Sequence, residues 1–177
     1  MNATVRKIEV SEIYDAYNII ENGREILKSD GCNQWQDGNP DLNKIKDYVS
    51  KEQMYGVFDD GVLCFVGAVI CGEIESSYKH LYSGDWQLYT SDYLTIHSVA
   101  VKKEYQGKGL YNYFFDFVTT EAKCCPNHSI KSIRIDTHSD NKRMQHIIEK
   151  RGFVYCGIVY LDYLKTNRKR IVYELVL

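Results

Sequence analysis

Residues 93–111 read YLTIHSVAVKKEYQGKGLY, and this stretch decides the fold that the 177-residue sequence predicts. Its first nine residues are rich in β-branched and aromatic side chains, which favours a strand that ends at Val101. A glycine turn follows, and the apolar spacing from Tyr111 to Lys123 is that of a helix. A strand, a turn and a helix therefore follow one another directly.

The turn Gln106-Gly107-Lys108-Gly109 has the composition of an anion-binding site. Its glycines allow tight backbone angles and expose a row of N–H groups, and the helix that follows adds the positive end of its dipole. Lys108 adds a charge beside them. The phosphate loop G-x-x-x-x-G-K-S/T and the dinucleotide pattern G-x-G-x-x-G are both absent from this stretch. On spacing alone, a turn that merely joins the strand to the helix is an equal alternative.

A second strand and helix follow the first pair. Residues from Ile130 to Thr137 predict a strand, and residues from Asn141 to Arg151 predict a helix that ends at Gly152. This is a βαβ core, and the strands Val154 to Leu161 and Ile171 to Leu177 come after it.

Before the core, the pattern predicts two helices and a hairpin. Ser11 is the expected N-cap of a first helix, whose apolar stripe is interrupted near Gly23, and a second helix begins near Asp41. Residues 5–10 form a first strand, and residues 55–71 form a hairpin that turns at Asp59-Asp60-Gly61. Residues 72–92 show no clear period, so no structure is predicted for them.

We therefore predict a single α+β domain over residues 1–177. Its core is a central, mixed, mostly antiparallel twisted sheet of about seven strands, flanked by about four helices. On the strand from Tyr93 to Val101, alternation places His97, Val99 and Val101 on one face.

Composition and charge exclude several kinds of function. A formal net charge of -2 gives no basic field for nucleic acid, and the basic run at residues 165–170 is expected to be a solvated hairpin. No apolar stretch is long enough to span a membrane, and the polar N-terminus lacks a secretion signal, which favours the cytoplasm. The 6 cysteines lack a repeated C-x-x-C spacing, so we expect reduced thiols and no metal site, at Cys124 and Cys125 as elsewhere.

The two strand–helix pairs together resemble the GNAT acetyltransferase superfamily. Its diphosphate signature Q/R-x-x-G-x-G/A follows a strand that ends in a V-x-V-like run. Here Val99-Ala100-Val101 precedes Gln106-Gly107-Lys108-Gly109-Leu110-Tyr111. A helix that opens at Asn141 and closes at Gly152-Phe153 lies at the family's distance downstream. The resemblance is strong from residue 93 to about residue 161 and looser before it.

The resemblance implies an acetyl-CoA-dependent N-acetyltransferase that works by direct attack in a ternary complex. Backbone groups of Val99, Ala100 and Val101 would hold the pantetheine arm, which in this family lies like an extra strand in a gap between this strand and the one from Ile133 to Thr137. Asn141 would contact the cofactor near this arm. The diphosphate would be held by the amides of Gln106, Gly107, Lys108, Gly109, Leu110 and Tyr111.

Two positions depart from the family pattern. Tyr111 stands where the signature has Gly or Ala, so its ring must point away from the phosphates or narrow their seat. Ile148 stands where many relatives have the tyrosine that protonates the departing thiolate, so a different acid or water must serve. These departures leave open the alternative of a coenzyme-A-binding sensor or regulatory domain without catalysis.

Acetyl transfer to an amine needs a base, a donor for the carbonyl oxygen and a proton for sulfur. His97 is the preferred base, because an unperturbed imidazole has a pKa of about 6.5, and a packed strand residue is the alternative. Glu73, acting through water, is the second base, and a backbone N–H near Val99 is the donor. Asp136 and His138 are expected to make structural hydrogen bonds.

The acceptor itself is not readable from the sequence. We expect a primary amine of a small molecule, with Trp35 as an apolar wall of its site, although an indole that anchors its loop is the alternative. Pairing of sheet edges into a homodimer is left open, since no residue argues for or against it.

Overall fold

A computed structural model describes residues 2–124 and 129–177. Its sheet has eight strands in the order β1-β2-β3-β5-β6-β8-β7-β4, and all neighbours are antiparallel except β5 and β6, which are parallel. The strands are β1 (Ala3–Lys7), β2 (Met54–Asp59), β3 (Val62–Cys71), β4 (Ser83–Gly84), β5 (Tyr93–Val101), β6 (Ser132–Thr137), β7 (Val154–Tyr160) and β8 (Lys169–Val176).

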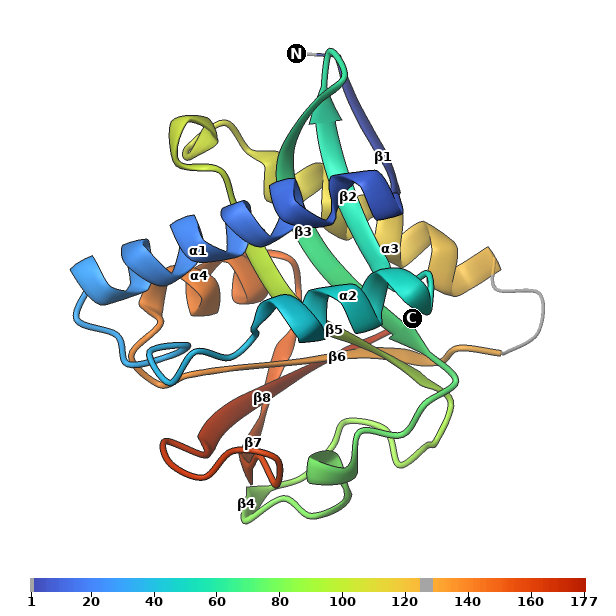
Figure 1. Cartoon of the computed structure of the whole chain (residues 1–177). Coiled ribbons are helices and arrows are strands. Elements are labelled where there is room, and N and C mark those ends of the chain that lie inside the picture. Colours follow the sequence, from blue (N-terminus) through green and yellow to red (C-terminus); the bar gives the residue numbers. More distant parts are fainter. Residues whose placement is uncertain (1, 125–128) are drawn as a thin grey trace.

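Four α-helices cover the two faces of this sheet (Figure 1). Helices α1 (Ile13–Ser29) and α2 (Leu42–Ser50) cross one face, and α3 (Leu110–Cys124) and α4 (Lys142–Lys150) lie behind it on the other. Three short 3-10 turns complete the order: η1 (Val10–Glu12), η2 (Ser76–Lys79) and η3 (Lys103–Tyr105). The predicted α+β class with a mixed, mostly antiparallel sheet is confirmed, and the strand beyond the expected seven is the two-residue β4.

Local sequence explains the hairpin and, in part, the first helix. Asp60 and Gly61 both have positive φ, at 48° and 81°, as a tight two-residue hairpin turn requires. The prediction of Ser11 as N-cap is wrong, because Glu9 and Glu12 form a capping box at the start of η1. Helix α1 runs through Gly23 without a break, and its buried residues stop at Ile20 and resume at Leu27, as the interrupted apolar stripe predicts.

The parallel strands β5 and β6 separate towards their C-terminal ends. They pair only from Tyr93 opposite Ser132 to Ile96 opposite Ile135, although β5 continues to Val101. Beyond this point β5 pairs with β3 alone. We call the space between the diverging ends, bordered by residues 97–101 and 136–137, the β5–β6 gap.

A β-bulge lies in β5 at the start of this gap. The register against β3 shifts between Val66 and Ala68, and Ser98 has a φ of 52°, which is rare for a residue other than glycine. The bulge changes the alternation of faces. Val99 and Val101 enter the core beneath α3, whereas Ala100 packs on the α1 side. The prediction that His97, Val99 and Val101 share a face is therefore wrong, because one extra residue lies between them.

The segment from residue 72 to residue 92, for which no structure was predicted, is anchored by a buried ion pair. Arg134 Nε donates to Glu174 Oε1 at 2.8 Å, and both side chains are at most 4% exposed. The Arg134 guanidinium stacks on the rings of Trp86 and Tyr93, 4.0 Å from each centroid, and donates to the Leu88 carbonyl at 2.8 Å. These contacts hold the segment against the sheet.

Two further predictions concern cysteines and membranes. Cys32, Cys64 and Cys156 are buried thiols, whereas Cys125 and the side chain of Cys124 lie outside the described part of the chain. Within residues 2–124 and 129–177, every helix is too short or too polar to cross a bilayer.

Candidate active site

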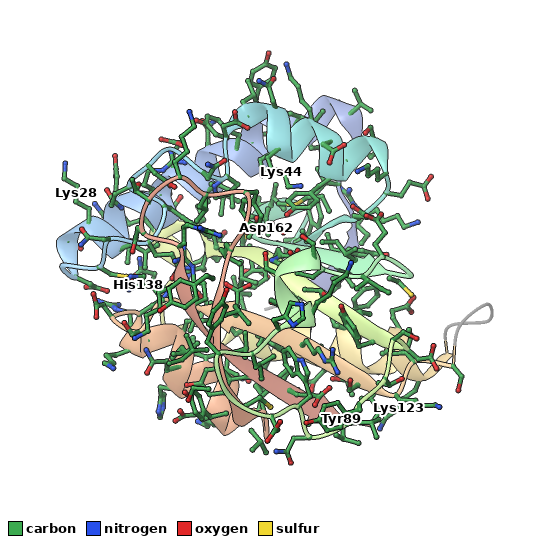
Figure 2. The ribbon with its side chains drawn as sticks, turned by 90° about the horizontal axis from the view of Figure 1, so that it is seen from below. Lys28, Lys44, Tyr89, Lys123, His138 and Asp162 are labelled. Carbon is green, nitrogen blue, oxygen red and sulfur yellow. The ribbon has the colours of Figure 1, made fainter. Side chains whose placement is uncertain are left out.

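One large cavity, of about 890 Å³, follows the β5–β6 gap. It extends from the turn before α3, past the bulge, to the segment around Glu75, and α1, α2, α4 and the β7–β8 loop complete its walls. Figure 2 views the molecule from below and labels two residues of the wall, Lys44 on α2 and Asp162 on the β7–β8 loop. The residues predicted from sequence that line it are Trp35, Glu73, His97, Val99, Ala100, Val101, Gln106, Gly107, Gly109, Tyr111 and Asn141.

The glycine turn forms one end of the cavity. Gly107 and Gly109 both have a φ of 73°, and no atom outside the turn lies within 4 Å of the place where a Gly107 side chain would be. This open backbone, directly before the N-terminus of α3, has the geometry of an anion-binding turn. Lys108 and Leu110 do not line the cavity: the Lys108 ammonium lies over the Tyr105 ring, and Leu110 is buried in the core.

The ring of Tyr111 points away from the glycine turn and leaves space there for an anion. Its ring packs edge-on against Phe65, with the centroids 4.9 Å apart, beside the core cluster beneath α3. Burial raises the pKa of Tyr111 to about 12, so the phenol stays neutral. The ring therefore points towards the core. A residue larger than Gly or Ala at this position of the signature must point this way if the turn is to stay open.

Asn141 lies on the far side of the gap, where it caps α4. Its Oδ1 accepts from the Met144 amide at 3.1 Å, and its Nδ2 donates to Gln34 Oε1 at 3.0 Å. One hydrogen and one lone pair of this amide remain for a ligand in the cavity.

His97 lies between two carboxylates at the other end of the cavity. Its Nε2 is 3.5 Å from Glu75 Oε2, and its Nδ1 is 3.8 Å from Asp136 Oδ1. Asp136 is held in turn by Tyr78, whose hydroxyl donates to Oδ1 at 2.7 Å, and by Arg170, whose Nε is 3.7 Å from Oδ2. The side chain of His97 is 11% exposed, so the ring is shielded from bulk water yet faces the cavity.

Two neighbouring groups have shifted pKa values. Burial acts to raise the pKa of Glu75, but the hydrogen bond and charge of His97 and the bonds from Ser77 outweigh it, so the net shift is downward. Burial raises the pKa of Tyr48 above its usual range, although the Ser98 side chain at the bulge acts to lower it. At neutral pH the site thus holds an ionised Glu75 and a protonated Tyr48.

The structure distinguishes His97 from Glu73, the two residues that the sequence offers as the base. Glu73 accepts from Gln53 Nε2 at 2.7 Å, whereas the carboxylates that lie near the His97 ring are those of Glu75 and Asp136. Sequence reasoning missed Glu75, because it lies in the segment without a period. The amide of Glu75 donates to the Tyr93 hydroxyl at 3.1 Å, so the Arg134 anchor also positions this carboxylate.

Of two other residues named from the sequence, Arg170 lies elsewhere than expected and His138 does not. Arg170 belongs to the basic run predicted to be solvated, yet it is 4% exposed and faces Asp136, because β8 runs through the middle of the sheet. His138 has the expected structural role: its Nε2 lies 2.8 Å from Asn167 Oδ1.

The state of Glu75 gives a pH-dependent prediction. Because its pKa is lower in the folded protein, its contribution to stability is complete above its ordinary pKa of about 4.5 and is lost as the pH falls through the lower folded value. We expect Glu75→Gln to lose about 1 kcal/mol, or about 2 to 4 °C in melting temperature, at pH 6 to 8. Melting curves below pH 4.5 should show a smaller difference in melting temperature between the wild type and Glu75→Gln. A difference in melting temperature that grows as the pH falls would contradict the lowered pKa of Glu75.

Among the described residues, no three or more His, Cys, Asp or Glu side chains are arranged to hold a metal ion. The cavity itself offers two kinds of chemistry to a ligand. It has an anion-binding turn at one end and an imidazole between carboxylates at the other.

Comparison with known proteins finds similar solved structures. An acetyltransferase of the GNAT family from Streptococcus agalactiae is 30% identical, with a TM-score of 0.86, over 100% of this chain and 96% of that chain. One from Listeria monocytogenes is 18% identical, with a TM-score of 0.73, over 99% of this chain and 95% of that one. The structure of yncA from Salmonella typhimurium, solved with its cofactor acetyl-CoA, is 16% identical, with a TM-score of 0.68, over 100% of this chain and 95% of that one.

No curated protein matches the sequence. The profile described as "Acetyltransferase (GNAT) family" matches residues 19–153, which is most of the chain and includes the bulge, the glycine turn and Asn141. The chain belongs to the GNAT acetyltransferase family.

Proposed function

We propose that the protein is an N-acetyltransferase that uses acetyl-CoA and acts on a small primary amine by direct attack in a ternary complex. One observation carries the proposal: a single cavity joins the open glycine turn to His97 between Glu75 and Asp136. We further propose that residues 1–177 act as one such domain in the cytoplasm, whether as a monomer or as a homodimer.

The residues present fit acetyl-CoA. The turn at Gly107 and Gly109 exposes backbone amides for the diphosphate, and Lys150 adds positive charge on the α4 side of the cavity, where Arg143 and Arg151 pair with Asp30 and Asp116. The β5–β6 gap would take the pantetheine arm beside Val99, Ala100 and Val101, where β5 has no hydrogen-bonded neighbour on the β6 side.

When bound, acetyl-CoA supplies a thioester carbonyl that an amine nitrogen attacks, so that a C–N bond forms and the C–S bond breaks. His97 takes the proton that the amine must lose, and Glu75 and Asp136 stabilise the resulting imidazolium. Ser98 and Val99 at the bulge have no residue opposite them in the register with β3, and their backbone N–H groups would donate to the carbonyl oxygen. Tyr48 keeps its proton and lies at the bulge, so it replaces the family tyrosine, absent at Ile148, as the donor to sulfur.

The charge of the acceptor end favours a cationic amine. Four carboxylates, Glu73, Glu75, Asp136 and Asp162, line this end of the cavity, and Arg170 is the guanidinium beside them. On the α2 rim, Lys44 and Lys51 both pair with Asp47, at 3.8 and 3.1 Å. The net negative charge would attract an alkylammonium group and repel a carboxylate.

A series of three amines, each with a chain of four carbons, tests the function. With acetyl-CoA, we expect thiol release to follow 1,4-diaminobutane above butylamine above 4-aminobutanoate. The first and last should differ in kcat/KM by about tenfold or more, which is about 1.4 kcal/mol. Raising the salt concentration should reduce this difference in kcat/KM, because salt screens the charges. Acetylation of each amine is checked by mass spectrometry. Binding of acetyl-CoA without thiol release to any of a wide panel of amines would instead indicate a sensor domain.

A further inference from the structure

The loop that joins α1 to α2 contacts one side of the β5–β6 gap through Gln34. The side chain is 8% exposed, and three donors converge on its Oε1. These are Thr137 Oγ1 at 3.1 Å, the His138 amide at 3.2 Å and Asn141 Nδ2 at 3.0 Å. One carbonyl oxygen therefore ties the loop to the end of β6 and to the start of α4, which together form one side of the β5–β6 gap.

The next residue, Trp35, packs on the opposite side of the gap. A Cβ placed on Gly23 of α1 would lie 3.0 Å from Trp35 Cζ3 and 3.1 Å from Ala100 Cβ of β5. The indole is thus wedged against α1 beside β5, and it packs on the same core cluster as Ala100. It is part of the cavity wall at this point.

The loop that carries the two residues is itself held in place. Arg24 of α1 donates from Nε to the Trp35 carbonyl at 2.9 Å, and from Nη2 to the carbonyls of Gly38 and Pro40 at 3.1 and 2.9 Å. Trp35 has a φ of 68°, which turns the backbone between the two adjacent side chains. The loop therefore acts as a rigid bridge.

We infer that Gln34 and Trp35 form a clasp that sets the width of the β5–β6 gap and positions acetyl-CoA, and that Trp35 is not an acceptor-binding residue. The inference rests on the proposed function, in which the pantetheine arm lies in this gap. Beyond Ile96 and Ile135 the two strands share no hydrogen bonds, so the sheet itself does not hold them at a defined separation. An arm that lies like a strand needs both sides at strand spacing, and a fixed gap removes the entropic cost of arranging them.

The clasp is tested by substitutions at Gln34 with coenzyme A as the probe. Gln34→Leu removes the hydrogen-bond acceptor Oε1. Gln34→Asn shortens the side chain by one methylene, so its carbonyl oxygen lies farther from the three donors. Calorimetry should show a Kd for coenzyme A raised by about tenfold or more in the first and by a smaller factor in the second. Gln34→Glu keeps an oxygen at the same place, next to the positive end of α4, and should stay within about threefold of the wild type. Val57→Ala, in the core of β2, is the control for lost stability without a change at the gap.

Kinetics and fluorescence separate positioning from a general loss of stability. Both Gln34→Leu and Trp35→Ala should raise the KM for acetyl-CoA by about tenfold while changing the KM for the amine by less than about twofold. The chain has 2 tryptophans, so Trp86→Phe leaves Trp35 as the indole reporter, and its emission should change when coenzyme A binds.

The outcomes are distinct for the two proposals. Absence of coenzyme A binding by the wild type would overturn the proposed function. Wild-type binding with an unchanged Kd in both Gln34→Leu and Gln34→Asn would overturn the clasp alone. A weakening in Val57→Ala equal to that in Gln34→Leu, or a Trp35→Ala protein that loses affinity for the amine and not for acetyl-CoA, would overturn it as well.

Discussion

His97→Gln is expected to lower kcat/KM for the acceptor by about 100-fold or more, which is the usual contribution of a positioned general base. The glutamine fills much of the space of the ring but cannot accept the proton. Initial rates with 1,4-diaminobutane measure this loss.

Two comparisons make the His97 result specific. His80→Gln changes an exposed histidine that does not line the cavity, and it should leave the rate unchanged. His97→Gln should keep its thermal stabilisation by acetyl-CoA, since the glycine turn is untouched. Wild-type turnover in His97→Gln would transfer the role of base to Glu73 or to water held by Glu75.

Gly109→Val should abolish the stabilisation of the protein by acetyl-CoA. At about 100 times its dissociation constant, a ligand stabilises the wild type by about 2.7 kcal/mol, or about 5 to 10 °C in melting temperature for a chain of this length. A side chain at Gly109 would stand 3.4 Å from Asn112 Nδ2 at the mouth of the turn, and a φ of 73° is strained for valine. The turn would then present fewer amides to the diphosphate.

The control for Gly109→Val must carry the same backbone strain. Gly61 has a φ of 81° with open space around it, in the hairpin turn between β2 and β3 and outside the cavity. Gly61→Val should therefore lower the melting temperature of the free protein and keep the full shift with acetyl-CoA. An undiminished shift in Gly109→Val would show that the diphosphate binds elsewhere.

The end of the cavity that holds His97 shows which features the sequence does not predict. His97 could be named, because it lies on a strand that leads into a recognisable turn. Glu75 could not, because its place depends on the Arg134–Glu174 ion pair and on Tyr93, which join segments far apart in the sequence. Arg170 was misjudged for the same reason, since a basic run has no pattern that distinguishes an exposed hairpin from a strand inside the sheet.

Local sequence alone determined the strand, the glycine turn and the helix of this protein, and also the Asp60-Gly61 hairpin. These features depend on backbone angles and periodicities that a few neighbouring residues settle among themselves. Tertiary structure alone decided the bulge at Ser98 that separates the faces of His97 and Val99, and the three donors that meet on Gln34. Both arise from contacts between residues many positions apart, whose energies no local pattern records.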